Sequence, residues 1–122
     1  MKTVMVVDDS RIMRNIVKNT FSNLKIPVSF LEAEDGIKAL QALLNNRVDL
    51  IFLDWNMPNL SGIDFLRKVR AIEAYKSVPI IMVTSESAKL SVVEAVKEGI
   101  TAYITKPINE KIFMDKLSKI TF

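Results

Sequence analysis

Apolar residues in this chain follow two alternating patterns. Short, mostly apolar runs are typical of strands buried on both faces, and each is followed by a stretch with the three-to-four spacing of an amphipathic helix. We expect strands at 4–7, 28–31, 50–54, 80–83 and 102–105. The apolar positions that mark the helices are Ile12, Met13, Ile16, Val17, Phe21 and Leu24; Ile37, Leu40, Leu43 and Leu44; Ile63, Leu66, Val69 and Ile72; Leu90, Val93 and Val96; and Ile112, Phe113, Leu117 and Ile120.

Local signals place the ends of several of these helices. The segment 25–27 contains Pro27 and breaks the first helix, while Gly99 ends the fourth. Ser61 and Asn109 are expected N-caps. The alternation predicts one α/β domain over residues 1–122, with a five-stranded parallel sheet and five helices divided between its two faces. We expect no attached output domain.

A parallel sheet gathers residues that are far apart in the chain. The carboxyl ends of parallel strands meet at one edge, where ligands bind in open α/β sheets. We therefore expect one rim to carry residues from four strand ends: Asp8, Asp9, Asp54, Thr84 and Lys106.

Composition narrows the chemistry available to that rim. The chain has no cysteine and no histidine, which excludes disulfides, thiolate or imidazole metal sites and imidazole catalysis. The net charge of +3 comes from dispersed basic residues, which favours solvated helix surfaces over nucleic-acid binding. No segment resembles a signal peptide or a membrane span, so we expect a cytoplasmic protein.

The three acids at the rim predict a metal ion. Converging carboxylates repel one another unless a cation joins them, and oxygen ligands favour Mg²⁺ or Mn²⁺. Considered separately, Asp8 and Asp9 also fit a solvated acidic turn, and Asp54 fits a strand-ending residue that hydrogen-bonds its own turn. The hydroxyl of Thr84 and the ammonium of Lys106 favour phosphoryl transfer, with Asp54 as the nucleophile that becomes an aspartyl phosphate.

Five segments together resemble the receiver domains of response regulators, and more narrowly single-domain, CheY-like chemotaxis regulators. Each segment alone is a weak signal, but five in order along essentially the whole chain are specific. They are Val6-Val7-Asp8-Asp9-Ser10, Glu32-Ala33-Glu34-Asp35-Gly36, Leu53-Asp54-Trp55-Asn56-Met57-Pro58, Met82-Val83-Thr84-Ser85 and Lys106-Pro107. The resemblance implies a flavodoxin-like (CheY-like) fold with strand order 2-1-3-4-5, which the apolar pattern alone does not define.

The resemblance also implies a role for each rim residue. Asp54 resembles the phosphoacceptor. Asp9 and Asp54, with the backbone carbonyl of Asn56, resemble the ligands of Mg²⁺ or Mn²⁺, and Asp8 acts through water. Thr84 resembles the switch hydroxyl that moves toward the phosphoryl group.

Further roles extend outward from the rim. Lys106 resembles the charge partner of the phosphoryl group, and its bond to Pro107 is a candidate cis peptide. Tyr103 resembles the aromatic ring that turns inward with the switch; without the resemblance it fits a half-buried strand tyrosine. Asn56 and Glu86 are expected to tune dephosphorylation, or to be ordinary exposed loop residues.

The function implied is that of a signalling protein and not of a turnover enzyme, because it would catalyse only its own phosphorylation and dephosphorylation. The implied partners are a histidine kinase, a flagellar motor switch protein and a phosphatase, with no nucleic acid and no membrane insertion. We expect a monomer whose output surface, on the fourth helix, fifth strand and fifth helix, includes Lys89, Tyr103, Lys111 and Lys116.

The sequence departs from the family pattern at two positions, and two other functions also fit parts of it. Ser85, and Ile100 after Gly99, stand where the family commonly has alanine, which can alter access to the acceptor or partner choice. A phosphorelay intermediate that passes its phosphoryl group to a histidine is an alternative within signalling. An Mg²⁺-dependent aspartate-nucleophile phosphatase fits less well, because Asn56 stands where its general acid is needed.

Overall fold

The computed structural model describes residues 1–85 and 89–122, with side chains for all of them except 89 and 90. Within this part of the chain five parallel strands form one sheet in the order β2-β1-β3-β4-β5. The elements are β1 (Thr3–Val7), α1 (Arg11–Asn23), β2 (Ser29–Ala33), α2 (Gly36–Asn45), β3 (Leu50–Asp54), α3 (Gly62–Arg70), the 3₁₀ turn η1 (Glu73–Tyr75), β4 (Ile80–Thr84), α4 (Lys89–Lys97), β5 (Ala102–Thr105) and α5 (Glu110–Ser118). The predicted fold class, strand order and alternation are confirmed.

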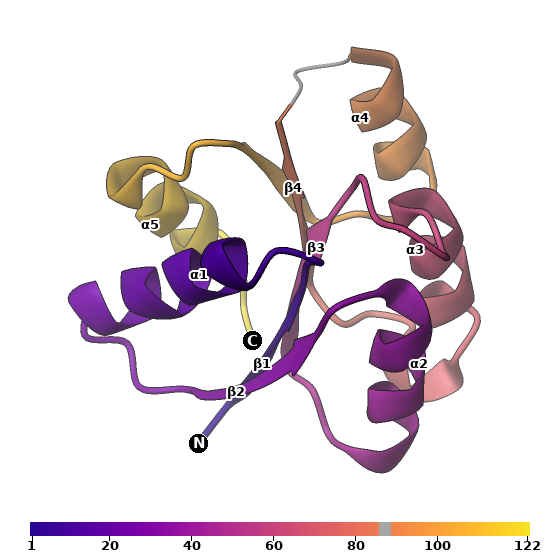
Figure 1. Cartoon of the computed structure of the whole chain (residues 1–122), viewed down its shortest axis with the longest axis horizontal. Coiled ribbons are helices and arrows are strands. Elements are labelled where there is room, and N and C mark those ends of the chain that lie inside the picture. The colour runs from indigo at the N-terminus through magenta and orange to yellow at the C-terminus, as the bar shows by residue number, and fades with distance from the viewer. Residues whose placement is uncertain (86–88) are drawn as a thin grey trace.

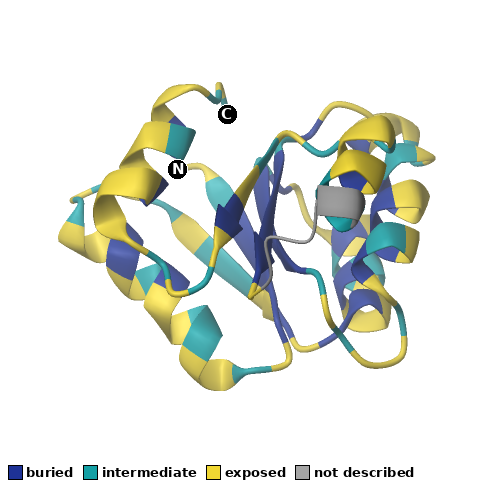
Figure 2. Ribbon diagram, turned by 90° about the horizontal axis from the view of Figure 1, so that it is seen from above, coloured by how far each residue is buried: buried dark blue, intermediate teal, exposed yellow. Residues whose placement is uncertain are grey.

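Helices cover both faces of the sheet, as predicted. The pair α1 and α5 lies on one face, and α2, α3 and α4 lie on the other (Figure 1). The inner strands β1, β3 and β4 are largely buried, the edge strands β2 and β5 are only partly buried, and the outer sides of the helices are exposed (Figure 2). None of the helices described is both long and apolar enough to cross a membrane.

The alternation of side chains along the strands divides the core in two. Val6 and Phe52 pack with Val17, Phe21 and Phe113 in the layer under α1 and α5. The intervening strand residues form the layer under α2 and α3: Met5, Val7, Ile51 and Leu53, packed with Ala39, Leu43, Phe65, Leu66 and Val69. Each central strand is therefore buried on both faces, which explains its continuous apolar sequence.

The structure corrects some details of the predicted elements. The second strand runs from Ser29 to Ala33, further than 28–31, because its parallel register with β1 continues until Ala33 pairs with Val7. In α1, Ile12 is 73% exposed, whereas Val17 and Phe21 face the core. The spacing identified the helix, but only one side of its apolar stripe is buried.

The fourth helix shows a similar difference. Two of its predicted apolar positions, Val93 and Val96, are 51% and 59% exposed, whereas Ala95 is buried. The side chain of the third, Leu90, is not among those that the structure describes. On the side that faces α3, Arg67 of α3 pairs with Glu94 and Glu98 at 3.5 and 3.3 Å. The contact between α3 and α4 therefore includes exposed ion pairs.

Candidate functional site

The strand ends bring the predicted rim residues to one edge of the sheet. Asp54 is the last residue of β3 and pairs in register with Val83, while Thr84 is the last residue of β4. The hydrogen bonding continues past the strands, because the N–H of Lys106 donates to the carbonyl of Thr84 at 2.7 Å. The N–H of Trp55 likewise donates to the carbonyl of Val83 at 3.1 Å. These bonds hold the loops that leave β3 and β5 against β4.

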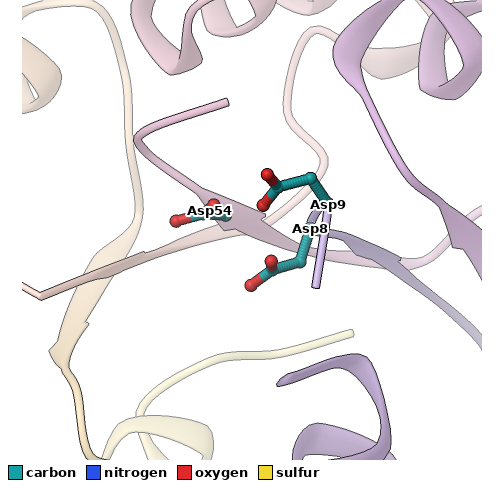
Figure 3. A group of neighbouring side chains, drawn as sticks. All are labelled: Asp8, Asp9 and Asp54. Carbon is teal, nitrogen blue, oxygen red and sulfur yellow. The ribbon is translucent and has the colours of Figure 1, made fainter. Parts of the chain in front are cut away.

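Three carboxylates meet at this edge. Asp8 and Asp9 follow β1 directly, and their side chains gather beside Asp54 at the end of β3 (Figure 3). One carboxylate oxygen from each lies within 4.8 Å of the others. Asp8 and Asp54 are both 5% exposed, whereas Asp9 is exposed to solvent. The sequence prediction that these acids converge agrees with the structure.

Lys106 forms ion pairs with two carboxylates of this acidic cluster. Its Nζ lies 3.3 Å from Oδ1 of Asp54 and 3.6 Å from Oδ2 of Asp8. The Lys106 side chain is only 22% exposed, so water screens these contacts less than it screens surface ion pairs. A single ammonium therefore faces two buried carboxylates, and the local charge remains negative.

The electrostatic cost of this arrangement appears in two pKa values. Burial raises the pKa of Asp54, and the neighbouring Asp8 raises it further; Lys106 and the backbone N–H of Asn56 oppose the shift without cancelling it. Burial likewise raises the pKa of Asp8 against the effects of the Ser10 N–H and Lys106. Both carboxylates would be stabilised in their ionised form by an added cation.

The donor atoms present fit a hard divalent cation. Every side-chain ligand in the cluster is a carboxylate oxygen, the donor type that Mg²⁺ and Mn²⁺ prefer. In Asp8, Oδ1 already accepts the Ser10 N–H at 2.8 Å and Oδ2 faces Lys106. Asp54 is engaged in the same way, by Lys106 and by the Asn56 N–H, whereas Asp9 is exposed to solvent, so Asp9 offers the carboxylate that an incoming cation reaches most readily.

The other predicted site residues lie at different distances from this cluster. Thr84 is 3% exposed at the end of β4, next to β3. Asn56 is exposed in the loop after β3, and the Lys106–Pro107 peptide is cis, as expected. Tyr103 is on β5, in register with Met82 two residues before Thr84, and is 38% exposed.

The expected output surface is only partly described. Nζ of Lys116 lies 5.2 Å from the centre of the Tyr103 ring, and Lys111 is exposed near the start of α5. Glu86 lies outside the residues that the structure describes, and so does the side chain of Lys89.

Arg14 contacts the site but was not predicted to do so. Its guanidinium donates to the backbone carbonyl of Asp8 at 2.6 Å and to the Glu32 carboxylate at 3.0 Å. In the sequence Arg14 is one of many dispersed basic residues. The available signal was its position one turn into the helix that follows the acidic pair, from which a long side chain reaches back to the loop.

Comparison with known proteins identifies the family of this chain. Residues 4–118 match the response regulator receiver domain family. The chain is 42% identical over 118 residues to chemotaxis protein CheY1 of Helicobacter pylori, covering 96% of this chain and 94% of that protein. It is 39% identical over 117 residues to chemotaxis protein CheY of Pseudomonas aeruginosa, with coverage of 96% and 94%.

Solved structures extend the comparison. Chemotaxis protein CheY4 of Vibrio cholerae superposes with a TM-score of 0.90 at 32% identity, covering 99% of both chains. The receiver domain of the sensor histidine kinase PA1611 from Pseudomonas aeruginosa, which has a magnesium ion coordinated in its active site cleft, gives a TM-score of 0.84 at 24% identity. It covers 97% of this chain and 95% of that one, and at this identity the likeness concerns the fold. The chain belongs to the family of response regulator receiver domains.

Proposed function

We propose that this protein is a phosphorylation-dependent signalling switch in chemotaxis, and that Asp54 accepts the phosphoryl group. The observation that carries the proposal is the buried Asp54 carboxylate, which lies beside two further acids and within 3.3 Å of Lys106. A buried carboxylate with a cation site and an ammonium around it is suited to attack phosphorus.

In the proposed transfer, one carboxylate oxygen of Asp54 attacks the phosphorus of a phosphohistidine on a histidine kinase. The new oxygen–phosphorus bond forms as the phosphorus–nitrogen bond breaks, and its electron pair stays on the imidazole. In this proposal Lys106, which already contacts Asp54, balances charge on the phosphoryl oxygens, and Thr84, at the end of the neighbouring strand, donates its hydroxyl to one of them. No general base is needed, because Asp54 acts as a carboxylate.

The proposed cation site uses Asp9, Asp54 and the backbone carbonyl of Asn56, with Asp8 contributing through water. Mg²⁺ or Mn²⁺ bound there would neutralise charge on the phosphoryl oxygens. The convergence of the three carboxylates supports a cation site here, and the solvent exposure of Asp9 supports its role as a direct ligand.

The proposed output is binding of a flagellar motor switch protein by the surface formed by α4, β5 and α5. A cavity of about 320 Å³ lies on this surface, lined by Val96, Ile100, Thr101, Ala102, Tyr103, Lys116, Lys119 and Ile120. Tyr103 stands at its border, partly exposed, so a change in its position alters the surface that a partner meets. We propose that Glu86 and Asn56 set the lifetime of the signal.

The deciding experiment is phosphorylation by a small phosphodonor with Mg²⁺, followed by intact-mass measurement. We expect one phosphoryl adduct on the wild type, none on Asp54→Asn, and an unchanged adduct on Asp115→Asn, which alters an exposed acid of α5. Absence of the wild-type adduct, or its persistence in Asp54→Asn, would overturn the proposal.

A second experiment tests the partner. Beryllofluoride-treated wild type should retain a motor switch protein that the Asp54→Asn variant does not retain. Transfer of the phosphoryl group to a histidine-bearing protein, without motor binding, would instead assign the chain to a phosphorelay.

A further inference from the structure

The turn between β2 and α2 has no part in the chemistry proposed above, although Asp35 and Gly36 lie in a segment that carries the family resemblance. Asp35 is 8% exposed and uses its two carboxylate oxygens for two contacts. Oδ1 accepts the N–H of Lys38 at 2.8 Å and so caps α2. Oδ2 accepts from Nδ2 of Asn59 at 3.3 Å, in the loop that follows Asp54.

Gly36 makes a second contact with the same loop. A Cβ atom at this position would lie 3.0 Å from Cδ2 and 3.1 Å from Cβ of Leu60. The start of α2 therefore touches Asn59 and Leu60, two consecutive residues, through a hydrogen bond and through close packing. Leu60 in turn packs against the core layer under α2 and α3.

The loop of residues 55–62 is also closed at its base. The N–H of Gly62 donates to the carbonyl of Trp55 at 3.3 Å, and a Cβ atom at Gly62 would lie 2.5 Å from the Trp55 ring. Asn59 sits at the far side with a φ of 69°, a left-handed conformation that asparagine tolerates. The loop is thus held at its base by Trp55 and at its tip by Asp35.

We propose that Asp35 and Asn59 are positioning residues for the cation site, an inference that rests on the function proposed above. Asn56 lies inside this braced loop, and its backbone carbonyl is the proposed ligand. A ligand held in place before the cation arrives does not have to be ordered during binding, which raises affinity. Asp35 thereby links the start of α2 to the loop that completes the site.

The matched test compares Asn59→Gly with Lys25→Gly. Each replaces an exposed residue of positive φ, 69° and 57°, but Lys25 lies in the turn between α1 and β2. We expect Asn59→Gly to weaken Mg²⁺ binding about ten-fold, and Lys25→Gly to leave it unchanged. Titration calorimetry measures the affinity, and amide exchange of residues 56–60 without metal should accelerate only in Asn59→Gly.

Exchanging the side chains of Asp35 and Asn59 separates the effect of their hydrogen bond on Mg²⁺ affinity from the effect of loop flexibility. Asn59→Asp sets two carboxylates against each other and should weaken Mg²⁺ binding, although the added negative charge alone would strengthen it. Combining Asn59→Asp with Asp35→Asn restores one amide facing one carboxylate, with the wild-type net charge and an acceptor still available to cap α2. The pair should recover most of the lost affinity.

The outcomes distinguish this inference from the proposed function. If the wild type fails to bind Mg²⁺, both are overturned. If the wild type binds, but Asn59→Gly and Asn59→Asp bind equally tightly, only the positioning role is overturned.

Discussion

Phe52 and Asp54 are two residues apart in β3 and point toward the same face of the sheet, yet their surroundings are opposite in kind. Phe52 stacks on Phe113 with ring centres 5.2 Å apart and meets the edge of Phe21 at 5.7 Å. Asp54 meets Asp8 and Lys106. On one face of β3, two successive side chains therefore take part in a favourable aromatic contact and in a cluster of repelling charges.

The difference shows how stability and reactivity are divided along β3. The aromatic cluster joins α1, β3 and α5, which are distant in sequence, and all three rings are at most 1% exposed. Its burial stabilises the fold whether or not the rim is charged. At the rim, in contrast, burial and neighbouring negative charge raise the pKa values of Asp8 and Asp54. Their ionised carboxylates therefore lower the stability of the fold until a cation binds.

The largest expected effect on stability comes from removing one ring of the aromatic cluster. Phe113→Ala removes a buried ring from contact with Phe21 and Phe52 and should lower the free energy of unfolding by about 3–5 kcal/mol. Urea denaturation measures the change. The adjacent Met114, 44% exposed, gives the control, because Met114→Ala should change stability by less than about 0.5 kcal/mol. Equal effects of the two substitutions would contradict the role of the cluster.

The next effect comes from adding a cation to the charged side. Mg²⁺ at 100 times its dissociation constant should stabilise the wild type by about 2.7 kcal/mol, because binding to the folded state alone shifts the unfolding equilibrium. Asp54→Asn should lose most of this increment, whereas Phe113→Ala should retain it if measured where the variant is still folded. Thermal unfolding with Mg²⁺ or with chelator provides the measurement. Similar increments in wild type and Asp54→Asn would place the cation elsewhere.

The rim was predictable from the sequence because it depends on topology. Once strands and helices alternate, Asp8, Asp54 and Thr84 must share an edge, wherever the loops run. The order of the strands was available only from the family resemblance, since apolar periodicity does not say which strands are neighbours. Its agreement with the structure therefore supports the resemblance more than the pattern.

Contacts that depend on the reach of side chains were not predictable. The hydrogen bond between Asp35 and Asn59 joins residues 24 apart through the conformation of two loops. In α4 the apolar spacing of Val93 and Val96 indicated a helix, but both side chains are exposed and the smaller Ala95 is buried. Periodicity identifies a helix, whereas the side of the helix that is buried depends on tertiary contacts that the spacing does not define.

A smaller effect should follow from removing one of the repelling charges. Asp8→Asn keeps an acceptor for the Ser10 N–H and removes the charge that raises the pKa of Asp54. Without metal, the variant should be about 1 kcal/mol more stable than the wild type near neutral pH. Because the folded wild type has a raised Asp8 pKa, its stability falls as pH rises through that value. The difference between the proteins should therefore shrink on acidification, and a difference that grew would be the wrong sign.

The smallest expected effect concerns Glu32, whose pKa shift has the opposite sign to that of Asp8. Glu32 is partly exposed; burial raises its pKa, but hydrogen bonds and charges from Arg14 and Lys18 lower it more, so the net shift is downward. A lowered pKa stabilises the fold above the unfolded value, and this stability is lost as pH falls through the folded value. Glu32→Gln should therefore cost less than about 1 kcal/mol near neutral pH, and nothing at low pH where the glutamate is protonated.

Denaturation of Asp8→Asn and Glu32→Gln across the same pH range, without metal, tests both signs together. Differences of the same sign would mean that burial does not separate the two acids, because the comparison requires a buried carboxylate to oppose folding and a paired surface carboxylate to favour it.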